Sequence, residues 1–428
     1  MYYLARLMRQ AYWSRSKLTD FQDRKVRAIM KYAFEYSRFY NERFKQLGLR
    51  PDDVKGVRDL NKLPIFRRGE LQKNAEKIVS DKFDIDGLEV DRTSGSSGQP
   101  LLVYLSRKED EFRKAKMLRA NISCGQRFRD RWLVITSPRH QSKQGGLQKL
   151  LGVYSPFSVS VFENLATQFS IFEKFKPDVI EGYSSSLVLL ASEIERMGIQ
   201  HVGARLIIGG AELVDEPSRC FVERIFGAPF YDQYASVELE AMAWQCVEKS
   251  GYHVDADSVV MQFVDEEGEE VAPGERGEIV CTSLFNYAMP FIRYAIGDVG
   301  ISSDEECTCG RGFPLMKMIE GRKDSFVRFP DGRLVSPRNF TIAMSTFSLY
   351  DQVDRFRVVQ KRRDVVEYIV KLKNGVADSR SLALLLEAHV TKTLRLEESG
   401  VKTVVRFADD IPLDKGGKLK AVVSDFKS

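Results

Sequence analysis

A stretch of small polar residues, Arg-Thr-Ser-Gly-Ser-Ser-Gly-Gln-Pro, occupies positions 92–100 between two β-prone segments, 88–90 and 101–105. The flanking segments predict a tight connection between two strands. Such a connection presents several backbone N–H groups and hydroxyls, a composition typical of loops that hold phosphate groups. It is not a P-loop, because no Gly-Lys-Ser/Thr follows it. An ordinary glycine-serine turn is the competing interpretation.

Two segments further along the chain combine an apolar strand with groups suited to a flat ligand and a metal ion. Residues 206–212, Leu-Ile-Ile-Gly-Gly-Ala-Glu, end in a glycine pair that lets a flat ligand approach the backbone. In residues 231–238, Tyr234 precedes Glu238 by four positions. An aromatic ring can stack on a purine, and a carboxylate can hold Mg²⁺ beside phosphates. For residues 206–212 a plain strand-to-helix turn is the alternative.

Three segments nearer the C-terminus carry charged side chains beside glycines. Residues 290–298 place Asp298 directly after a glycine, where its carboxylate suits two ribose hydroxyls. Residues 320–324, Glu-Gly-Arg-Lys-Asp, follow, and residues 411–418, Ile-Pro-Leu-Asp-Lys-Gly-Gly-Lys, end in Lys418. Each segment taken alone is compatible with an ordinary turn.

These five segments, in this order after residues 92–100, resemble the adenylate-forming superfamily of acyl-CoA ligases. Within it, the chain is most similar to the phenylacetate–CoA ligase-like branch, which includes capsule-biosynthesis proteins of the CapK type and deazaflavin-cofactor adenylating synthetases. The resemblance extends from Arg-Phe-Tyr-Asn-Glu-Arg at residues 38–43 to Lys418, and its strongest parts are residues 93–100, 290–298 and 321–324.

The resemblance implies an ATP site and a catalytic lysine. The residues assigned to ATP are Thr93, Ser94, Gly95, Ser96, Ser97 and Gly98 around the β- and γ-phosphates, Gly210, Ala211 and Glu212 along the adenine slot, Tyr234 stacked on the base, and Asp298 on the ribose. Glu238 would coordinate Mg²⁺, and Arg322 would reach ribose or phosphate. Asp324 would be the hinge of a tail domain, and Lys418 would neutralise charge at the α-phosphate as a carboxylate attacks.

The chain departs from the family pattern at several positions. Ala235 and Val237 stand where the family usually has glycine and then serine or threonine. Leu413 stands where many members have arginine, and the glycine at 416–417 is doubled. The lost hydroxyl removes a phosphate or acyl contact. We therefore expect nucleotide binding more firmly than rapid acyl-CoA synthesis.

The acyl pocket is expected to be built from residues 137–146, 181–186 and 231–236. Tyr183 and Phe157 in or near these segments would favour a flat acid, although aromatic side chains near a pocket more often serve packing.

The pattern of apolar residues predicts an α/β fold with two domains. Short apolar strands alternate with helices between residues 132 and 208, which predicts a mostly parallel sheet. We expect a large domain over 1–322, with a helical leader to about residue 80 (one helix over 21–47) and an antiparallel subdomain over about 252–320. A small, mobile α+β lid domain over 323–428 is expected to follow.

Composition excludes several classes of protein. The 428 residues carry a net charge of only +5, too diffuse for a nucleic-acid partner but compatible with an anionic small ligand. No run of about 18 uncharged apolar residues predicts a membrane span, and the first ten residues do not resemble a secretory signal. Six cysteines in so long a chain do not make a disulfide scaffold, so a cytoplasmic location is expected.

A second group of residues has the composition of a metal site. Cys307 and Cys309 form a Cys-x-Cys pair, and Cys246 and His253 lie upstream with six residues between them. Three thiolates and one imidazole are the ligands of a closed structural Zn²⁺ site. Free buried cysteines and a surface histidine are the alternative, because the sequence does not show that the two pairs meet.

Three functions compete at this stage. The first is ATP-dependent activation of a carboxylic acid to acyl-AMP, followed by transfer to a thiol such as CoA. The second keeps the adenylation but uses another acceptor, in surface-polysaccharide or cofactor biosynthesis. The third is a nucleotide-binding protein without catalysis, for which Lys418 would have no use. Whether the chain forms a homodimer stays open.

Overall fold

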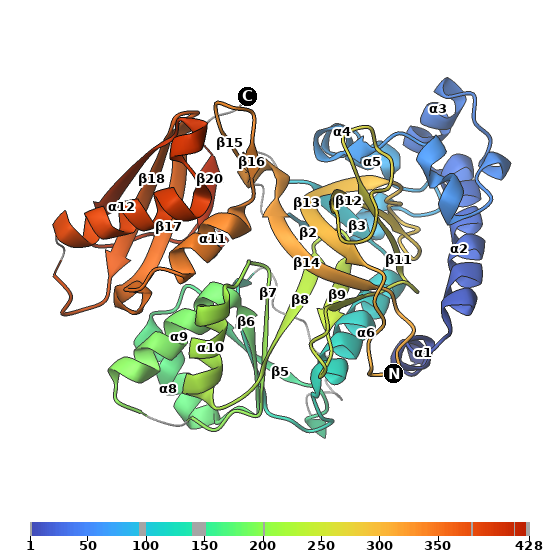
Figure 1. Ribbon diagram of the computed structural model, residues 1–428. Helices are drawn as coiled ribbons and strands as arrows, with labels where there is room; N and C mark the ends of the chain where they lie inside the picture. The colour runs from blue at the N-terminus through green and yellow to red at the C-terminus, as the bar shows by residue number, and fades with distance from the viewer. Residues whose placement is uncertain are drawn as a thin grey trace.

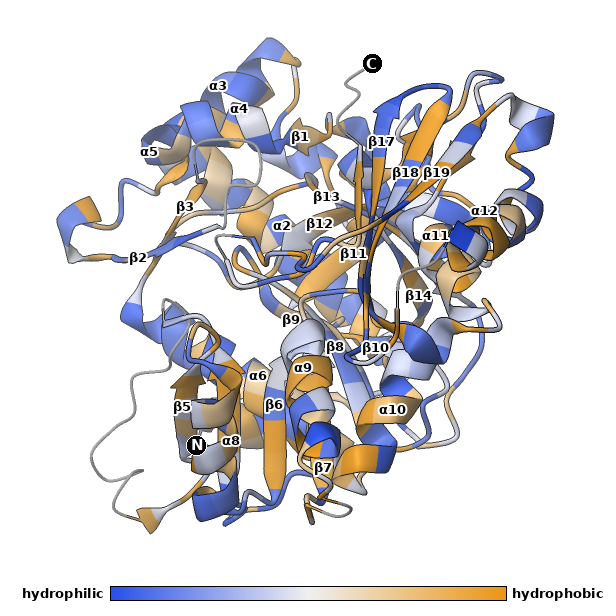
Figure 2. Cartoon of the chain, turned by 90° about the vertical axis from the view of Figure 1, so that its left-hand side faces the viewer, coloured by the Kyte–Doolittle hydropathy of each residue, from blue (hydrophilic) through white to orange (hydrophobic). Residues whose placement is uncertain are grey.

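A mixed sheet of twelve strands runs through the larger part of the computed structural model, which describes residues 2–93, 100–138, 151–199, 202–377, 380–414 and 416–424 (Figure 1). Its parallel half has the order β5 (Pro156–Ser160), β4 (Trp132–Thr136), β6 (Val179–Tyr183), β7 (Leu206–Gly210) and β8 (Phe230–Ser236). Apolar residues make up most of β4 and begin β6, β7 and β8, as expected for parallel strands covered on both faces. Figure 2 shows β6 as one of the hydrophobic strands.

Helices cover both faces of the parallel half. On one face lie α8 (Leu165–Phe175), α9 (Ser184–Arg196) and α10 (Glu216–Phe226), whose apolar side chains share a buried core with Ile180 and Ile207. On the other face, Cys124 at the end of α6 (Arg107–Cys124) is buried against Val179 and Ile208. The predicted α/β fold with a mostly parallel sheet is confirmed.

The antiparallel half continues the same sheet from β8. Its order is β9 (Glu240–Gln245), β10 (Tyr252–Val254), β14 (Leu315–Arg322), β13 (Tyr294–Ser303), β12 (Arg276–Ser283) and β11 (Val259–Val264), and β1 (Phe66–Arg67) pairs with β13. Antiparallel pairing therefore begins at Glu240, where β9 returns beside β8. The two halves meet edge to edge in one sheet.

Most of the N-terminal helices pack on this antiparallel half, and the first of them packs on α6. They are α1 (Tyr2–Gln10), α2 (Arg15–Tyr36), α3 (Arg38–Gln46), α4 (Arg68–Lys73) and α5 (Ala75–Ile78). The single helix expected over 21–47 is wrong, because Ser37 is extended and separates α2 from α3. The break turns Tyr40 into the core, where its hydroxyl donates to the carbonyl of Pro290 at 3.0 Å.

The strands on either side of the Ser/Gly stretch form an antiparallel hairpin, as predicted. In it, β2 (Glu89–Arg92) pairs with β3 (Leu102–Leu105), and the Thr93 N–H donates to the carbonyl of Leu101 at 3.1 Å. Residues Ser94–Gln99 themselves lie outside the described residues.

The C-terminal part has its own four-stranded sheet and core. The strand order is β19 (Lys402–Phe407), β18 (Val365–Leu372), β17 (Val353–Arg362) and β20 (Val422–Ser424), with helices α11 (Pro337–Ser345) and α12 (Arg380–Leu394). A two-stranded ribbon, β15 (Val327–Arg328) and β16 (Leu334–Val335), precedes it. The apolar residues of these elements form one buried cluster. A domain boundary at 322/323 stays a prediction.

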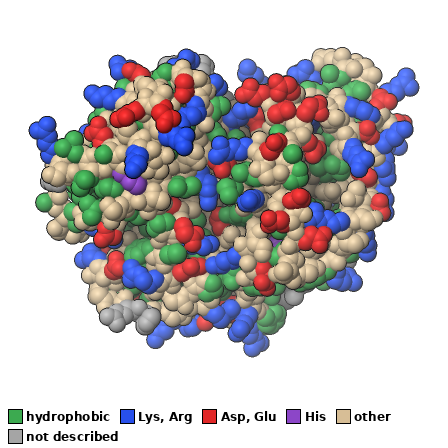
Figure 3. Space-filling model, viewed as in Figure 1, with side chains coloured by type: hydrophobic (Ala, Val, Ile, Leu, Met, Phe, Trp, Pro, Cys, Tyr) green, Lys and Arg blue, Asp and Glu red, His purple; other side chains and the backbone are tan. Residues whose placement is uncertain are grey.

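The surface seen in Figure 3 mixes Lys and Arg with Asp and Glu, in keeping with the small net charge. Among the helices of the described ranges, none has the length and apolar character needed to span a bilayer.

Close contact between β7 and β8 gives a first prediction. A Cβ at Gly209 would lie 2.0 Å from Cζ of the buried Phe230 ring. We expect Gly209→Ala to lower the free energy of unfolding by about 1–3 kcal/mol, because the ring must move in a packed core. Urea denaturation measures this. Gly69→Ala is the control, since its Cβ would meet nothing within 4 Å; equal effects of the two substitutions would contradict the prediction.

Candidate active site

One cavity of about 1780 Å³ lies where the strand ends of the large sheet meet the C-terminal part. Ten of the predicted site residues line it: Thr93, Gly210, Ala211, Glu212, Tyr234, Glu238, Asp298, Arg322, Asp324 and Lys418. The other predicted phosphate-loop residues, Ser94, Gly95, Ser96, Ser97 and Gly98, lie outside the described part of the chain. The cavity is large enough for a nucleotide together with a small acid.

The end of β7 forms one wall of the cavity by backbone alone. A Cβ at Gly210 would come within 2.7 Å of the Gln233 carbonyl oxygen on β8, so this position has no room for a side chain. Ala211 follows with φ +66°, in the left-handed region that L-residues rarely adopt. Gly210 thus lines the cavity with its backbone, where a flat ligand could approach closely, and the adenine slot stays a prediction.

The Glu212 side chain connects this wall to two other elements. Its carboxylate accepts a hydrogen bond from the Ser185 N–H in the first turn of α9 at 2.9 Å. It also accepts one from the N–H of Leu419, next to Lys418 in the C-terminal part. Burial raises the pKa of Glu212, although these donors oppose the shift. The carboxylate therefore holds the C-terminal segment against the end of the large sheet.

Tyr234, Asp298 and Arg322 form a connected polar group. The Tyr234 hydroxyl donates to Oδ2 of Asp298 at 2.6 Å, and Nη1 of Arg322 lies 3.4 Å from Oδ1 of the same carboxylate. Arg322 also donates to the carbonyl of Ile296 at 2.9 Å. Burial raises the pKa of Asp298, and Arg322 opposes the shift. The bond from Tyr234 to Asp298 was not foreseen, because 64 residues separate the two positions.

Glu238 lies almost completely buried in the cavity wall, with 4% of its surface exposed. Its Oε1 accepts from the Tyr294 hydroxyl at 2.8 Å, and its backbone carbonyl accepts from Nδ2 of Asn286 at 3.3 Å. Within the described residues no hydrogen bond reaches Oε2. A fixed carboxylate with one uncommitted oxygen fits the oxygen ligands that Mg²⁺ prefers.

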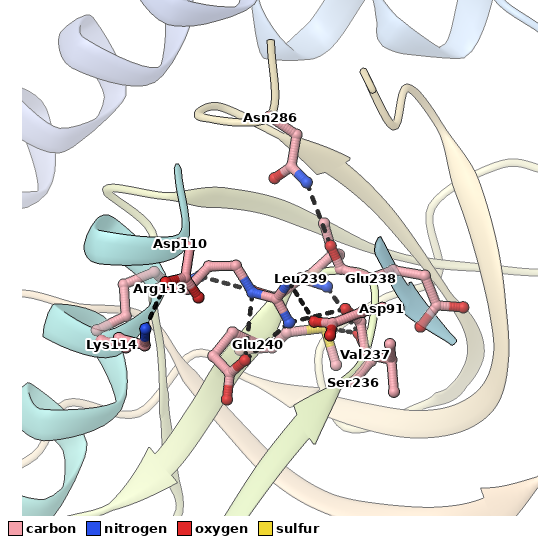
Figure 4. A network of polar contacts seen from close by, with 12 residues as sticks. Asp91, Asp110, Arg113, Lys114, Ser236, Val237, Glu238, Leu239, Glu240 and Asn286 are labelled. Atoms are coloured by element: carbon pink, nitrogen blue, oxygen red, sulfur yellow. Dashed lines mark hydrogen bonds and ion pairs between the residues drawn. The ribbon is translucent and has the colours of Figure 1, made fainter. Parts of the chain in front are cut away.

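Arg113 on α6 fixes the turn that carries Glu238 (Figure 4). Its guanidinium donates to the Val237 carbonyl at 2.9 Å and pairs with Glu240 at 2.8 Å and with Asp91 on β2 at 3.0 Å. One buried side chain thus links the β8–β9 turn to the hairpin of the Ser/Gly stretch. Sequence analysis missed Arg113, because a charged residue in an amphipathic helix gives no sign of distant partners.

Lys418 reaches the cavity from the C-terminal part. Its ammonium lies 5.1 Å from the centre of the Tyr183 ring, and burial lowers its pKa while Glu212 and Asp414 oppose the shift. Asp414 closes the loop by accepting from the N–H groups of Gly416 at 2.8 Å and Lys418 at 3.0 Å. A Cβ at Gly417, where φ is +81°, would lie 2.4 Å from Val161. Close approach thus accounts for this glycine.

Only some of the residues expected to form the acyl pocket line the cavity. Glu181, Tyr183, Asp232 and Gln233 line the cavity. Phe157 does not: its ring is 47% exposed and stacks on Phe175 at 5.1 Å. Successive side chains of a strand point to opposite faces. Pro156 and Ser158 on β5 line the cavity, so Phe157 between them points away from it. Of the expected segment 137–146, residues 139–146 lie outside the described ranges.

The predicted metal ligands come together away from this cavity. Potential ligand atoms of Cys246, His253, Cys307 and Cys309 lie within 4.8 Å of one another. The Sγ atoms of Cys246 and Cys307 are 3.6 Å apart, and Sγ of Cys309 is 3.3 Å from Nε2 of His253. Zinc–sulfur bonds of about 2.3 Å in a tetrahedron give edges of roughly 3.7 Å. The donor set therefore fits Zn²⁺, with all four positions filled by protein.

Zinc binding is testable on the purified protein. We expect one Zn²⁺ per chain by elemental analysis after expression without added metal. Cys309→Ser should reduce the bound zinc at least about tenfold and lower the unfolding temperature, because the binding energy of a structural metal contributes to folding. Cys220→Ser is the control, since this cysteine is exposed and outside the set. Protein without stoichiometric zinc would contradict the assignment.

Comparisons with known proteins agree with the predicted resemblance. No protein-family profile matches the chain. A phenylacetate–coenzyme A ligase of Aromatoleum evansii is 29% identical over 329 residues, 73% of this chain and 72% of that protein. Protein CapK of Staphylococcus aureus is 22% identical over 96% of this chain and 90% of its own length. 2-Hydroxyisobutyryl-CoA ligase, in its postadenylation state with 2-HIB-AMP, superposes with a TM-score of 0.82 at 19% identity, covering 97% of this chain and 91% of the other.

Proposed function

We propose that this chain, a relative of the phenylacetate–coenzyme A ligases with the fold of the adenylate-forming enzymes, activates a carboxylic acid with ATP and transfers the acyl group to coenzyme A. In the first step a carboxylate oxygen bonds to the α-phosphorus of ATP and the bond to pyrophosphate breaks. In the second, the thiol bonds to the acyl carbon and AMP leaves.

The observation that carries the proposal is the convergence of a lysine, an arginine and several fixed acceptors on one cavity. Displacement at phosphorus requires positioning and neutralisation of charge more than covalent help. Lys418 and Arg322 supply positive charge, and Glu238 fits the role of Mg²⁺ ligand. Bound Mg²⁺ would neutralise phosphate charge. Asp298 suits the ribose hydroxyls, and the Gly210 wall suits the flat base.

The position of the C-terminal part supports the first half-reaction in this conformation. The chain superposes on 2-hydroxyisobutyryl-CoA ligase with a TM-score of 0.82 for the postadenylation state and 0.65 for the thioesterification state. Lys418 is correspondingly inside the cavity. We infer that the C-terminal part turns about Asp324 for the second half-reaction, since Asp324 lies in the short turn Lys323–Ser325 between the two parts.

An acceptor other than coenzyme A is the second candidate. The match to CapK extends over 96% of this chain, against 73% for the Aromatoleum ligase, and Ala235 and Val237 depart from the ligase pattern. Pyrophosphate exchange with a panel of acids tests adenylation, and coenzyme A dependence of product formation separates the two acceptors. Free thiols and ATP use favour the cytoplasm for either reaction.

Lys418 provides the direct test of the first step. We expect Lys418→Ala to slow pyrophosphate exchange at least about 100-fold, the usual cost of removing one group that stabilises transition-state charge. ATP affinity, measured by calorimetry, should stay within a few-fold, because the lysine acts on developing charge. Lys392→Ala, on the exposed side of α12, is the control. Parallel losses of affinity and rate would make Lys418 a binding residue only.

Arg113 tests the positioning of Glu238. Arg113→Lys keeps the charge but removes the planar fork that contacts Asp91, Val237 and Glu240 together. We expect the adenylation rate to fall about tenfold and the Mg²⁺ concentration for half-maximal rate to rise. Arg107→Lys, in the exposed first turn of the same helix, should change neither. A slower rate with an unchanged Mg²⁺ requirement would show that Arg113 does not act through Glu238.

A further inference from the structure

A carboxylate stands in the apolar wall on the α6 side of the cavity. Glu181 is the middle residue of β6, on the face that also presents Val179 to the core under α6. Only 8% of its surface is exposed, yet the side chain lines the cavity. Burying a carboxylate in apolar surroundings costs free energy unless hydrogen-bond donors compensate it. The donors around Glu181 therefore indicate which ligand group could complete the site.

Two donors hold the same oxygen of this carboxylate. Oε2 of Glu181 accepts from Nδ2 of Asn121 at 3.0 Å and from Nε1 of Trp132 at 3.1 Å. The amide of Asn121 is oriented in turn, because its Oδ1 accepts from Nε2 of Gln233 at 2.8 Å. All four side chains are at least nine-tenths buried. The network fixes Oε2 as an acceptor and sets the direction of Oε1.

The other oxygen, Oε1, receives no hydrogen bond from any described residue. Trp132, Val134 and Ile208 line the cavity beside it and offer apolar surface. Burial raises the pKa of Glu181 to about 7, and the bonds from Asn121 and Trp132 oppose the shift. A further donor from a ligand would complete the hydrogen bonding of the group.

The strand sets how far this acceptor lies from the reacting end of the site. Glu181 precedes Tyr183 by two residues on β6, a rise of about 7 Å along a strand. The Lys418 ammonium lies over the Tyr183 ring. Roughly the length of a small organic acid therefore separates Glu181 from the region where the carboxylate would react.

We propose that the acyl pocket selects a small carboxylic acid that carries a hydroxyl or amino group at the end remote from its carboxylate, and that this group donates a hydrogen bond to Oε1 of Glu181. The inference rests on the proposed adenylation and names the class of acid. An acid without the donor leaves a buried acceptor unpaired, and sites built to bond a polar group discriminate strongly against analogues that lack it.

Matched pairs of acids test the proposal on the intact enzyme. Phenylacetate is compared with 4-hydroxy-, 3-hydroxy- and 4-aminophenylacetate, and pentanoate with 5-hydroxypentanoate, by kcat/KM for pyrophosphate exchange. The wild-type enzyme should prefer a donor-bearing acid at least about tenfold over its unsubstituted partner. The hydroxyl and amino acids in the panel show which donor is taken.

Glu181→Gln separates recognition from packing, because it keeps the shape of the side chain. The new amide oxygen must serve the donors of Asn121 and Trp132, so its NH₂ group faces the pocket and donates. The preference for hydroxyl or amino acids should fall at least about tenfold, and 4-methoxyphenylacetate, which can only accept, should gain. Asp178→Asn, just before β6 and paired with Arg131, is the control and should leave the preference unchanged.

Calorimetry of the same acids with a non-hydrolysable ATP analogue measures their affinities, and it tests the selectivity of the pocket independently of turnover. Exchange activity without preference for donor-bearing acids, or a preference unaltered in Glu181→Gln, overturns the role of Glu181 and leaves adenylation standing. Selective binding without exchange for any acid overturns adenylation and retains the role of Glu181. If the variant does not fold, the wild-type preference alone decides.

Discussion

The direction of the strands at the β8–β9 junction is the constraint on which the site depends. In the parallel half, the carboxyl ends of β6, β7 and β8 meet at one edge and bring Tyr183, Gly210 and Tyr234 together. At β9 the pairing becomes antiparallel, and β13 and β14 carry Asp298 and Arg322 to the same place. These five residues come from distant segments of the chain, and the ends of regular strands bring them together.

Buried carboxylates and basic side chains lie together in the cavity, and their charges partly compensate each other in the absence of a ligand. Burial raises the pKa of Glu212 and Asp298, and that of Asp232 to about 7. Each carboxylate has at least one donor from a tyrosine, a backbone N–H or an arginine. Arg322 and Lys418 face this set, and Arg68, Lys108 and Lys114 also line the cavity. A polyanionic nucleotide therefore meets positive charge from several elements, and a metal ion would supply more.

The features that could be predicted from the sequence are those that depend on residues close together in the chain. The apolar strands, the hairpin around the Ser/Gly stretch and the motif residues that line the cavity follow from short-range spacing or from motif resemblance. The break at Ser37 does not, because helical spacing continues through it, and the contacts that stabilise the turned Tyr40 come from distant residues, among them Pro290 and Ile292. The partners of Arg113 and Glu181 also lie far away in the sequence, so their roles depend on tertiary structure.

The loop between Cys309 and β14 ties the start of the chain to a much later segment. The Gly312 N–H donates to the Ala11 carbonyl at 3.0 Å, and a Cβ at Gly312 would lie 1.9 Å from the Trp13 carbonyl oxygen. At roughly 5–20 residues per second, a ribosome makes Gly312 about 15–60 s after Ala11. Residues 11–13 are thus made early but acquire these contacts late, whereas the α1 helix before them packs on α6, which is made long before Gly312.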